Sequence, residues 1–353
     1  MKINRKDLLS TINKVLPGIA VGNVSVEDAD KIVFTNGHVY SYNTAISVDA
    51  KLPEGVDIKG VVKGIDFYNC LSKLPGDEIE LDVSEESWKI TDGKIKIAIK
   101  LLPEENLMER FETLTPTDEW YDIDGEDFNM ALKVCAIPAN NSKFKGIYFT
   151  GDKAVATNKW IITKCIMKNE YPDFWIDDKA VSQLVKWNNF VKVQYNKVWV
   201  QFLSTDDTVF SVRSMNITDY PLATVLPILE DGIRAKKAFE IELKPQFYDA
   251  INRASEFSHT IDEHEAVVVE FGKEVKIKGS RTSGSYEETV NDMTVDIEIP
   301  KEMNFDYNDF ISSEKFFDVL KVVSDTPDFD TSNPIHCILE SENAVKLFSS
   351  MTE

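Results

Sequence analysis

The chain has few of the residues and motifs on which most enzymes depend. Its 353 residues include four histidines, which are too scattered to predict a general base with its partner. These are His38, His259, His264 and His336. The sequence also has no Gly-x-x-x-x-Gly-Lys phosphate loop, no Gly-x-Ser-x-Gly elbow and no His-Glu-x-x-His motif. We therefore predict a protein that is not an enzyme and that binds neither a metal nor a cofactor.

Cysteines and long apolar runs are equally scarce. The four cysteines stand singly in apolar surroundings, so we expect reduced core residues and neither a zinc site nor a redox pair. They are Cys70, Cys135, Cys165 and Cys337. No stretch approaches the roughly 18 uninterrupted apolar residues of a membrane span, and the amino terminus has no apolar signal region. These features predict a cytoplasmic protein without a membrane partner.

Positive charge is in short supply. The chain has 39 basic and 60 acidic residues, which gives a net charge of -21. An acidic surface of this kind excludes nonspecific binding of nucleic acid over the whole molecule, so any contact with DNA must be local. A hydrophobic content of 43% is typical of a soluble globular protein, and the length allows two or three domains.

Six segments share one pattern, in which apolar residues recur three or four positions apart and a cation stands near the end. In the first segment, Leu8, Ile12 and Val15 form one apolar face between Asp7 and Lys14. This spacing predicts a short helix with one buried face, and its charges suit the helix dipole. The six segments are residues 7–17, 66–76, 127–136, 180–189, 247–257 and 316–325. Their cations are Lys14, Lys73, Lys133, Lys186, Arg253 and Lys321.

Between these segments the hydrophobic period changes to two, which is typical of strands. Asn36 and Gly37 form a strong hairpin signal within residues 31–52. Similar alternation follows in residues 78–102, 146–167, 190–215 and 266–290. The sequence therefore predicts a unit of one short helix followed by several antiparallel strands, used about six times.

Two polar segments rich in turn-forming residues, 113–127 and 229–238, separate pairs of these units. They predict three similar domains, over residues 1–115, 116–232 and 233–353. We expect an α+β fold in which each domain packs two short helices side by side on antiparallel sheets.

This order of parts resembles the bacterial DNA polymerase sliding clamp, the beta subunit of DNA polymerase III. The resemblance covers essentially the whole chain. Its best local matches are "AVATNKWIITKCIM" (154–167), "DYPLATVLP" (219–227), "INRASEFS" (251–258), "SGSYEE" (283–288) and "KITDGKIKIAIKLLP" (89–103). Two segments depart from the family. Asn158, Lys159, Trp160 and Ile161 replace a turn of the Asp-Gly-His-Arg type, and "LFSSMTE" replaces an end with Met-Pro-Met. These departures suggest a divergent, phage-encoded clamp.

The resemblance implies that two chains close head to tail into a ring around double-stranded DNA. The six cations would then face phosphates, through contacts that carry no sequence information and are weak enough to let the duplex slide. The alternative is that these cations only complement the helix dipoles and aid solubility.

Two further sites follow from the same resemblance. One is a groove between the second and third domains for a short apolar peptide, with walls at Phe144, Thr157, Ile162, Pro221, Val225, Leu347 and Met351. The alternative is that most of these are core residues. The other is the subunit seam, where Ile97 and Ile99 on an edge strand would meet Glu256 and Phe257 of the second subunit.

The first function hypothesis is therefore a sliding clamp, a replication processivity factor without chemistry of its own. Its partners would be DNA polymerase, a second copy of the chain and an ATP-dependent clamp loader, since the chain has no nucleotide motif. A second hypothesis is an acidic scaffold or DNA mimic that sequesters clamp partners without encircling DNA. A weaker third hypothesis is a carbohydrate- or nucleotide-processing enzyme.

Overall fold

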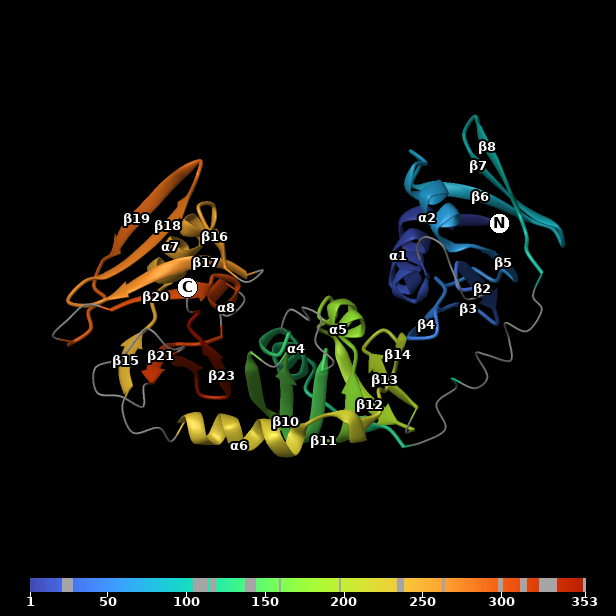
Figure 1. Ribbon diagram of the computed structural model, residues 1–353. Coiled ribbons are helices and arrows are strands. Elements are labelled where there is room, and N and C mark those ends of the chain that lie inside the picture. The colour runs from blue at the N-terminus through green and yellow to red at the C-terminus, as the bar shows by residue number, and fades with distance from the viewer. Residues whose placement is uncertain are drawn as a thin grey trace. The chain divides into compact units, whose positions relative to one another are not determined.

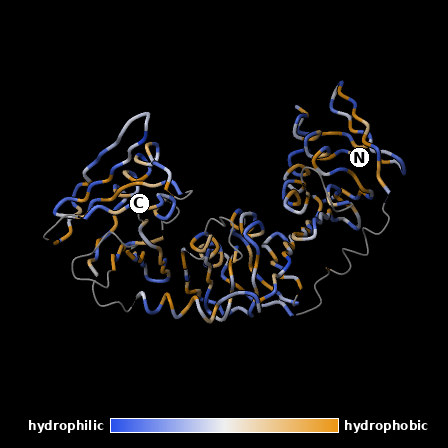
Figure 2. Tube along the Cα trace, in the orientation of Figure 1, coloured by the Kyte–Doolittle hydropathy of each residue, from blue (hydrophilic) through white to orange (hydrophobic). Residues whose placement is uncertain are grey.

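The computed structural model describes residues 1–20, 28–103, 114, 119–136, 144–158, 160–196, 198–233, 238–261, 264–297, 301–311, 316–323 and 335–351. These residues form short helices and antiparallel sheets, which confirms the predicted α+β class (Figure 1). Apolar and polar residues are interspersed along the whole trace, as Figure 2 shows. None of the helices in these ranges is long and apolar enough to cross a membrane.

The chain divides into two compact units, and the first comprises Met1–Asn129 and Ser182–Met215. Its smaller sheet has the order β1 (Lys2–Asn4), β6 (Glu78–Val83), β7 (Ser87–Asp92), β8 (Ile95–Lys100). Its larger sheet has the order β5 (Gly60–Lys63), β2 (Lys31–Thr35), β3 (His38–Tyr42), β4 (Ile46–Lys51), β14 (Val209–Arg213), β13 (Trp199–Ser204), β12 (Phe190–Tyr195), β9 (Tyr121–Asp122). The β4 and β14 strands pair, so this sheet joins the predicted first domain to the predicted second.

Two helices pack against these sheets, α1 (Arg5–Val15) and α2 (Gly64–Ser72). The side chain of Asn4 caps α1 by accepting hydrogen bonds from the backbone amides of Lys6 and Asp7. A 3-10 turn, η1 (Leu16–Gly18), follows α1. The rings of Phe34, Phe67 and Trp88 lie 5.0 to 5.7 Å apart, and they join both sheets to α2 in one core.

The second unit comprises Met130–Val181 and Asn216–Glu353. Its six-stranded sheet has the order β10 (Ile147–Thr157), β11 (Ile162–Ile176), β23 (Ala344–Ser349), β22 (His336–Glu340), β21 (Val319–Val323), β15 (Ala238–Glu242). Its five-stranded sheet has the order β16 (His259–Ile261), β17 (His264–Phe271), β18 (Val275–Arg281), β19 (Gly284–Val290), and β20 (Lys301–Asp306) also pairs with β17. The helical segments α6 (Leu222–Ile233), α7 (Pro245–Ser255), α8 (Asn308–Ile311) and η2 (Ile217–Asp219) complete this unit.

The helices α4 (Gly125–Val134) and α5 (Asp178–Leu184) each contribute residues to both units. The two units therefore cut through the predicted second domain, and the division into three domains stays a prediction.

A recurring contact ties the helices together in pairs. The Arg5 side chain on α1 donates to the carbonyl oxygens of Leu71, at the end of α2, and of Gly76. The Asn129 amide on α4 donates to the carbonyl of Val185, just after α5. The Tyr248 hydroxyl on α7 donates to the carbonyl of Phe317, beyond α8. In each pair, a side chain of the first helix satisfies a carbonyl group at or beyond the carboxyl end of the second.

The predicted hairpin at Asn36 and Gly37 is confirmed. Both residues have positive φ angles, 52° and 75°, and they connect β2 to β3. Asparagine and glycine tolerate this left-handed backbone, which matches the twist of the paired strands.

The predicted helix at residues 316–325 is wrong. Residues 319–323 form strand β21, which pairs with β15 on one side and β22 on the other. The segment is rich in valine, which favours strands, and its apolar residues fit both periodicities. The two flanking strands favour a strand over a helix here, because they offer β21 hydrogen bonds along both edges.

The second predicted linker is also partly wrong. Helix α6 continues through residues 229–233, and Pro227 lies inside it with an exposed side chain. The residues 234–237 lie outside the described part of the chain. Residues 113 and 115–118 of the first predicted linker, 113–127, also lie outside, and β9 and the start of α4 fall within the rest of it.

Candidate functional site

Five of the six candidate cations lie at the carboxyl ends of helices, as predicted. Lys14, Lys133 and Arg253 are in the last turns of α1, α4 and α7. Lys73 is the carboxyl cap of α2, and Lys186 follows the end of α5 by two residues. A cation at this end of a helix compensates the partial negative charge of its terminal carbonyls.

The sixth cation, Lys321, lies on strand β21, so its predicted place at a helix end is wrong. Its ammonium group is 2.6 Å from a carboxylate oxygen of Glu340 and 3.4 Å from one of Glu240. The hydrogen bond to Glu340 is the main reason that the pKa of Lys321 is raised. A lysine between two carboxylates offers little positive potential to a phosphate.

Lys14 also has a carboxylate partner. Its ammonium group lies 2.6 Å from Asp206, in the turn between β13 and β14. Asp206 accepts further hydrogen bonds from the Ser204 hydroxyl and the Thr208 amide. Burial alone would raise the pKa of Asp206, but the bonds from Lys14, Ser204 and Thr208 outweigh it and lower that pKa. The pair joins α1 to the larger sheet of the first unit.

Arg253 is engaged in a third ion pair. Its guanidinium group lies 2.8 Å from Glu288 on β19, and its Nε also donates to the Tyr286 hydroxyl at 3.0 Å. These hydrogen bonds raise the pKa of Arg253 further. The structure therefore links a candidate DNA contact to an edge strand of the five-stranded sheet.

The three other cations remain open to solvent. Lys73, Lys133 and Lys186 are exposed, and no carboxylate pairs with them among the residues that the structure describes. Lys186 donates to the neutral side chain of Gln183, at 2.8 Å. These three lysines are therefore the best placed of the six to attract a phosphate.

The candidate groove residues gather in the second unit, where three of them form one row across adjacent strands. Thr157 on β10 lies opposite Ile162 on β11, which lies opposite Leu347 on β23. Helix α6, which carries Val225, runs close by, since a Cβ at Gly232 would lie 3.4 Å from Leu347. Thr157, Ile162, Val225 and Leu347 are all less than 10% exposed, so they are core residues in this structure.

The other three candidate groove residues are half-buried. Phe144 lies against the ring of Tyr220, and Pro221 is the next residue. Met351 pairs with Asn304 of β20. An apolar peptide would find its accessible contacts at these three positions rather than at the buried row.

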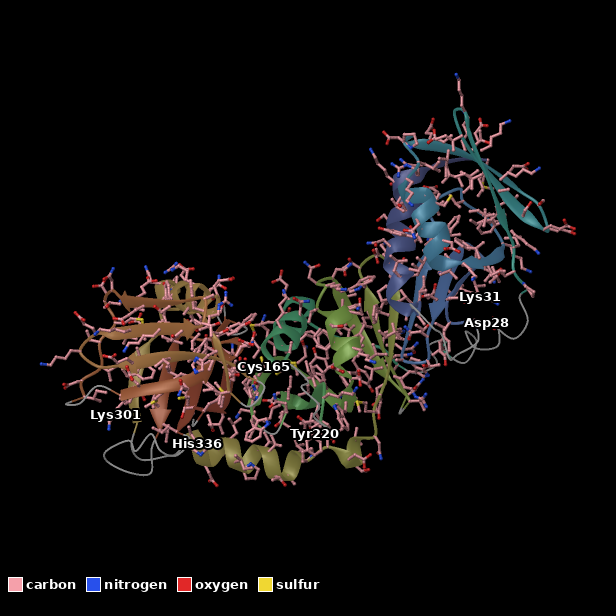
Figure 3. All side chains as sticks on the ribbon, turned by 45° about the horizontal axis from the view of Figure 1, so that its top comes forward. Asp28, Lys31, Cys165, Tyr220, Lys301 and His336 are labelled. Carbon is pink, nitrogen blue, oxygen red and sulfur yellow. The ribbon has the colours of Figure 1, made fainter. Side chains whose placement is uncertain are left out.

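Sequence reasoning missed the aromatic cluster that fixes the start of α6. Tyr220, labelled in Figure 3, stacks on Tyr148 and packs against Trp175, with ring centres 4.8 and 5.2 Å apart. Its hydroxyl donates to the carbonyl of Val155, and its burial raises its pKa. The three aromatic residues are far apart in the sequence, so no local pattern could have revealed them.

The turn that departs from the family pattern is held in place by one side chain. The Asn158 carboxamide accepts hydrogen bonds from the amides of Trp160 and Ile161. Ile161 is buried, whereas the Trp160 side chain is 73% exposed. Lys159 lies outside the described residues.

The predicted edge strand is confirmed as β8, at one end of the four-stranded sheet. Ile97 and Ile99 lie opposite Ile90 and Trp88, so they share the inner face of the sheet, yet both are only half-buried. Phe257 and the exposed Glu256 directly follow α7 in the second unit. The contact predicted between these two groups would join two chains and stays a prediction.

Comparison with solved structures finds the fold of bacterial DNA polymerase III beta sliding clamps along the full length of the chain. The *Helicobacter pylori* beta clamp, described as bound to a DNA ligase peptide, has a TM-score of 0.78 and 14% identity, with 100% of each chain covered. A *Bartonella birtlesii* sliding clamp bound to griselimycin has a TM-score of 0.77 and 16% identity, covering 100% of this chain and 99% of that one.

A putative DNA polymerase III beta subunit from *Eubacterium rectale* has a TM-score of 0.77 and 12% identity, with the same coverage. No protein-family model and no curated protein matches the sequence. At these identities the likeness establishes the fold, and the resemblance seen in the sequence is confirmed at that level.

Proposed function

We propose that this protein is a DNA sliding clamp, which encircles duplex DNA in the cytoplasm and tethers DNA polymerase and other partners. The observation that carries the proposal is the agreement with clamp structures over the whole chain, at TM-scores up to 0.78. The low identity of 12 to 16% supports a divergent version, and a phage origin stays a prediction from the sequence.

The DNA contacts in this proposal rest mainly on Lys73, Lys133 and Lys186. These lysines are exposed at or near helix ends and have no carboxylate partner among the described residues. Lys14 and Arg253 contribute less, because each already pairs with a carboxylate. A few phosphate contacts against a net charge of -21 give weak, salt-sensitive binding, which permits sliding.

Sheet topology supports the closure of a ring. Within one chain, the β4–β14 and β11–β23 pairs carry sheets across both predicted domain seams. The strands β8 and β19 each form one edge of the two remaining sheets. If β8 of one copy adds to β19 of another, the seam between subunits repeats the arrangement of the seams within the chain, and two copies form a closed ring. Ile97 and Ile99 would then meet Phe257 of the second copy.

Partner proteins would be held in the second unit, near Phe144, Pro221 and Met351. A short apolar peptide with a few polar anchors suits such a site. Tethering raises the effective concentration of a polymerase at the primer end. Loading would require a separate ATP-dependent clamp loader.

The test is retention on circular DNA. The loaded wild-type protein should stay on a nicked circle in high salt and leave it after linearisation. Changing Lys73, Lys133 and Lys186 together to Glu should reduce loading at least tenfold, while dimerisation persists. The matched control changes the exposed lysines Lys51, Lys89 and Lys273 to Glu and should load normally.

Three results would count against the proposal or a part of it. Retention that is unaffected by cutting the circle would show that topology is not the mechanism. A protein that binds polymerase peptides but never becomes linked to DNA would favour the acidic scaffold instead. Equal loading of the two triple variants would show that the helix-end lysines do not contact DNA.

A further inference from the structure

The end of α7 and the edge strand β19 are joined by a polar and aromatic network. The Arg253 guanidinium forms two bonds of 2.8 Å to the Glu288 carboxylate through Nη2, and its Nε lies 3.0 Å from both Glu288 and the Tyr286 hydroxyl. The Tyr286 hydroxyl also donates to Glu288. Each polar group of this network is thus held by two others, which leaves the carboxylate little freedom to rotate.

An aromatic stack continues the network to the residues after α7. The rings of Tyr286 and Phe257 are nearly parallel, with centres 6.3 Å apart. The guanidinium carbon of Arg281 lies 5.8 Å from the centre of the Phe257 ring. A Cβ at Gly284 would approach the Phe257 ring to 3.1 Å, and a Cβ at Gly279 would approach the Ala254 carbonyl to 2.6 Å and the Phe257 Cβ to 3.0 Å, so both glycines give Phe257 room. These contacts therefore fix the position of Phe257, although the residue is only half-buried.

Strand β19 needs such support because β18 is its only partner in the described part of the chain. Tyr286 and Glu288 lie opposite Gly279 and Ile277, so both point to the face of the sheet on which α7 packs. An edge strand without a second partner has lower local stability than a central one. Bonds from Arg253 to two of its residues fix the edge in the conformation that a further strand would meet.

Charge and polarity identify a second copy of this chain as the occupant of this edge. Strand β8 presents the half-buried Ile97 and Ile99 on one face and the exposed Lys96 and Lys100 on the other. The β19 side presents Phe257 and Tyr286 on one face and the exposed Glu287 on the other. Apolar groups meet apolar groups and lysines meet an acid when β8 pairs with β19, whereas two β8 edges would bring lysines together.

We propose that Arg253 is a positioning residue for subunit closure, which fixes Tyr286, Glu288 and Phe257 as the surface that receives β8 of a second copy. The inference rests on the proposed ring and changes the role of Arg253 within it. Burial alone would raise the pKa of Glu288, but the bonds from Tyr286 and Arg253 lower it, so the carboxylate stays ionised as a partner for the guanidinium. A guanidinium engaged in this way is largely unavailable to a phosphate.

Sedimentation velocity over a concentration series tests the proposal. Arg253→Gln should raise the dimer dissociation constant about tenfold, because the edge loses its bonds. Arg253→Lys should give an intermediate value, since an ammonium group cannot make the paired bonds of a guanidinium. Glu288→Gln should resemble Arg253→Gln. The matched control, Lys186→Gln, removes another helix-end cation and should leave the dissociation constant unchanged.

Hydrogen exchange at low concentration, where the protein is monomeric, supplies a readout that does not depend on dimerisation. Amides of β19 should exchange faster in Arg253→Gln, whereas those of α7 should not change. A dimer as tight as the wild type in both Arg253→Gln and Glu288→Gln, with loss of retention on DNA only in Arg253→Gln, would overturn the inference and make Arg253 a DNA contact. A wild-type chain that is monomeric at all concentrations would instead overturn the proposed ring itself.

Discussion

The helices α2 and α8 are fixed in different ways, although each is the second helix of a pair. Helix α2 pairs with α1, and α8 pairs with α7. Helix α2 has nine residues, buries Phe67 and Leu71, and is tied at its end by the Arg5 side chain. Helix α8 has four residues, and the phenylalanine on it, Phe310, packs among aromatic rings. These rings belong to Phe247, Phe305 and Phe348.

The short helix α8 is also held by a buried charge. The Lys346 ammonium group on β23 donates to the Asp309 carbonyl at 2.7 Å and lies 3.8 Å from the Asp309 carboxylate. Burial raises the pKa of Asp309 to about 6 and lowers that of Lys346. Both shifts show that ionising this pair costs free energy. The comparison indicates that the nine-residue helix is fixed by apolar packing and by bonds to its backbone, whereas the four-residue helix is fixed by aromatic packing and by a buried ion pair that orients it without adding net stability.

The largest expected effect comes from breaking that buried pair. Lys346→Met leaves the Asp309 carboxylate without its cation and should lower the free energy of unfolding by about 3–5 kcal/mol. The double variant Lys346→Met with Asp309→Leu removes both charges and should recover most of this loss. Urea titration followed by circular dichroism measures both variants. A double variant as unstable as the single one would show that the pair itself stabilises α8.

A smaller loss of stability is expected when the side-chain hydrogen bonds from Arg5 and Tyr248 to backbone carbonyls are removed. Arg5→Met removes two hydrogen bonds from a buried cation and should destabilise the protein by about 2–3 kcal/mol. Tyr248→Phe removes one neutral bond to the Phe317 carbonyl in the other pair and should cost about 1 kcal/mol. The same urea titration compares them. Equal losses would contradict the view that Arg5 has the greater part in fixing its helix pair.

The smallest effect is expected at the ion pair that Lys14 of α1 makes with Asp206. The pair is partly exposed, so Asp206→Asn should cost only about 0.5–1 kcal/mol after allowance for solvent screening. The pKa of Asp206 is lowered by folding, so its contribution is present at neutral pH and is lost as the pH falls below the ordinary value of about 4. The difference in stability between wild type and variant should therefore be constant from about pH 5 to 8 and shrink under acid. If the difference in stability between wild type and variant grew as the pH fell, it would contradict a lowered pKa of Asp206 in the folded protein.

Much of the fold followed from local patterns. The apolar spacing of Leu8, Ile12 and Val15 predicted α1, and similar spacing predicted α2, α4, α5 and α7. The Asn36-Gly37 turn predicted a hairpin. The same reasoning failed at β21 and did not find α6 or α8. Valine-rich or short segments carry too little local preference, and their structure depends on neighbours from distant parts of the chain.

The candidate site was harder to predict than the fold. The sequence could place six cations near the ends of apolar segments, but it could not show that Lys14 pairs with Asp206, 192 residues away. It also could not show that Arg253 engages Glu288 or that Thr157, Ile162 and Leu347 are packed in a core row. Exposure and ion pairing are properties of the surroundings of a residue, and the row arises only when β10, β11 and β23 are paired.

The sequence by itself determined the helix and strand periods, the charge at the helix ends and the acidic character of the chain, because these depend on residues only a few positions apart. The tertiary structure alone decided which cations remain available, which strand lies at each sheet edge and how the four-residue α8 is held. Those outcomes depend on groups that are brought together by folding across tens to hundreds of residues, and no local pattern records them.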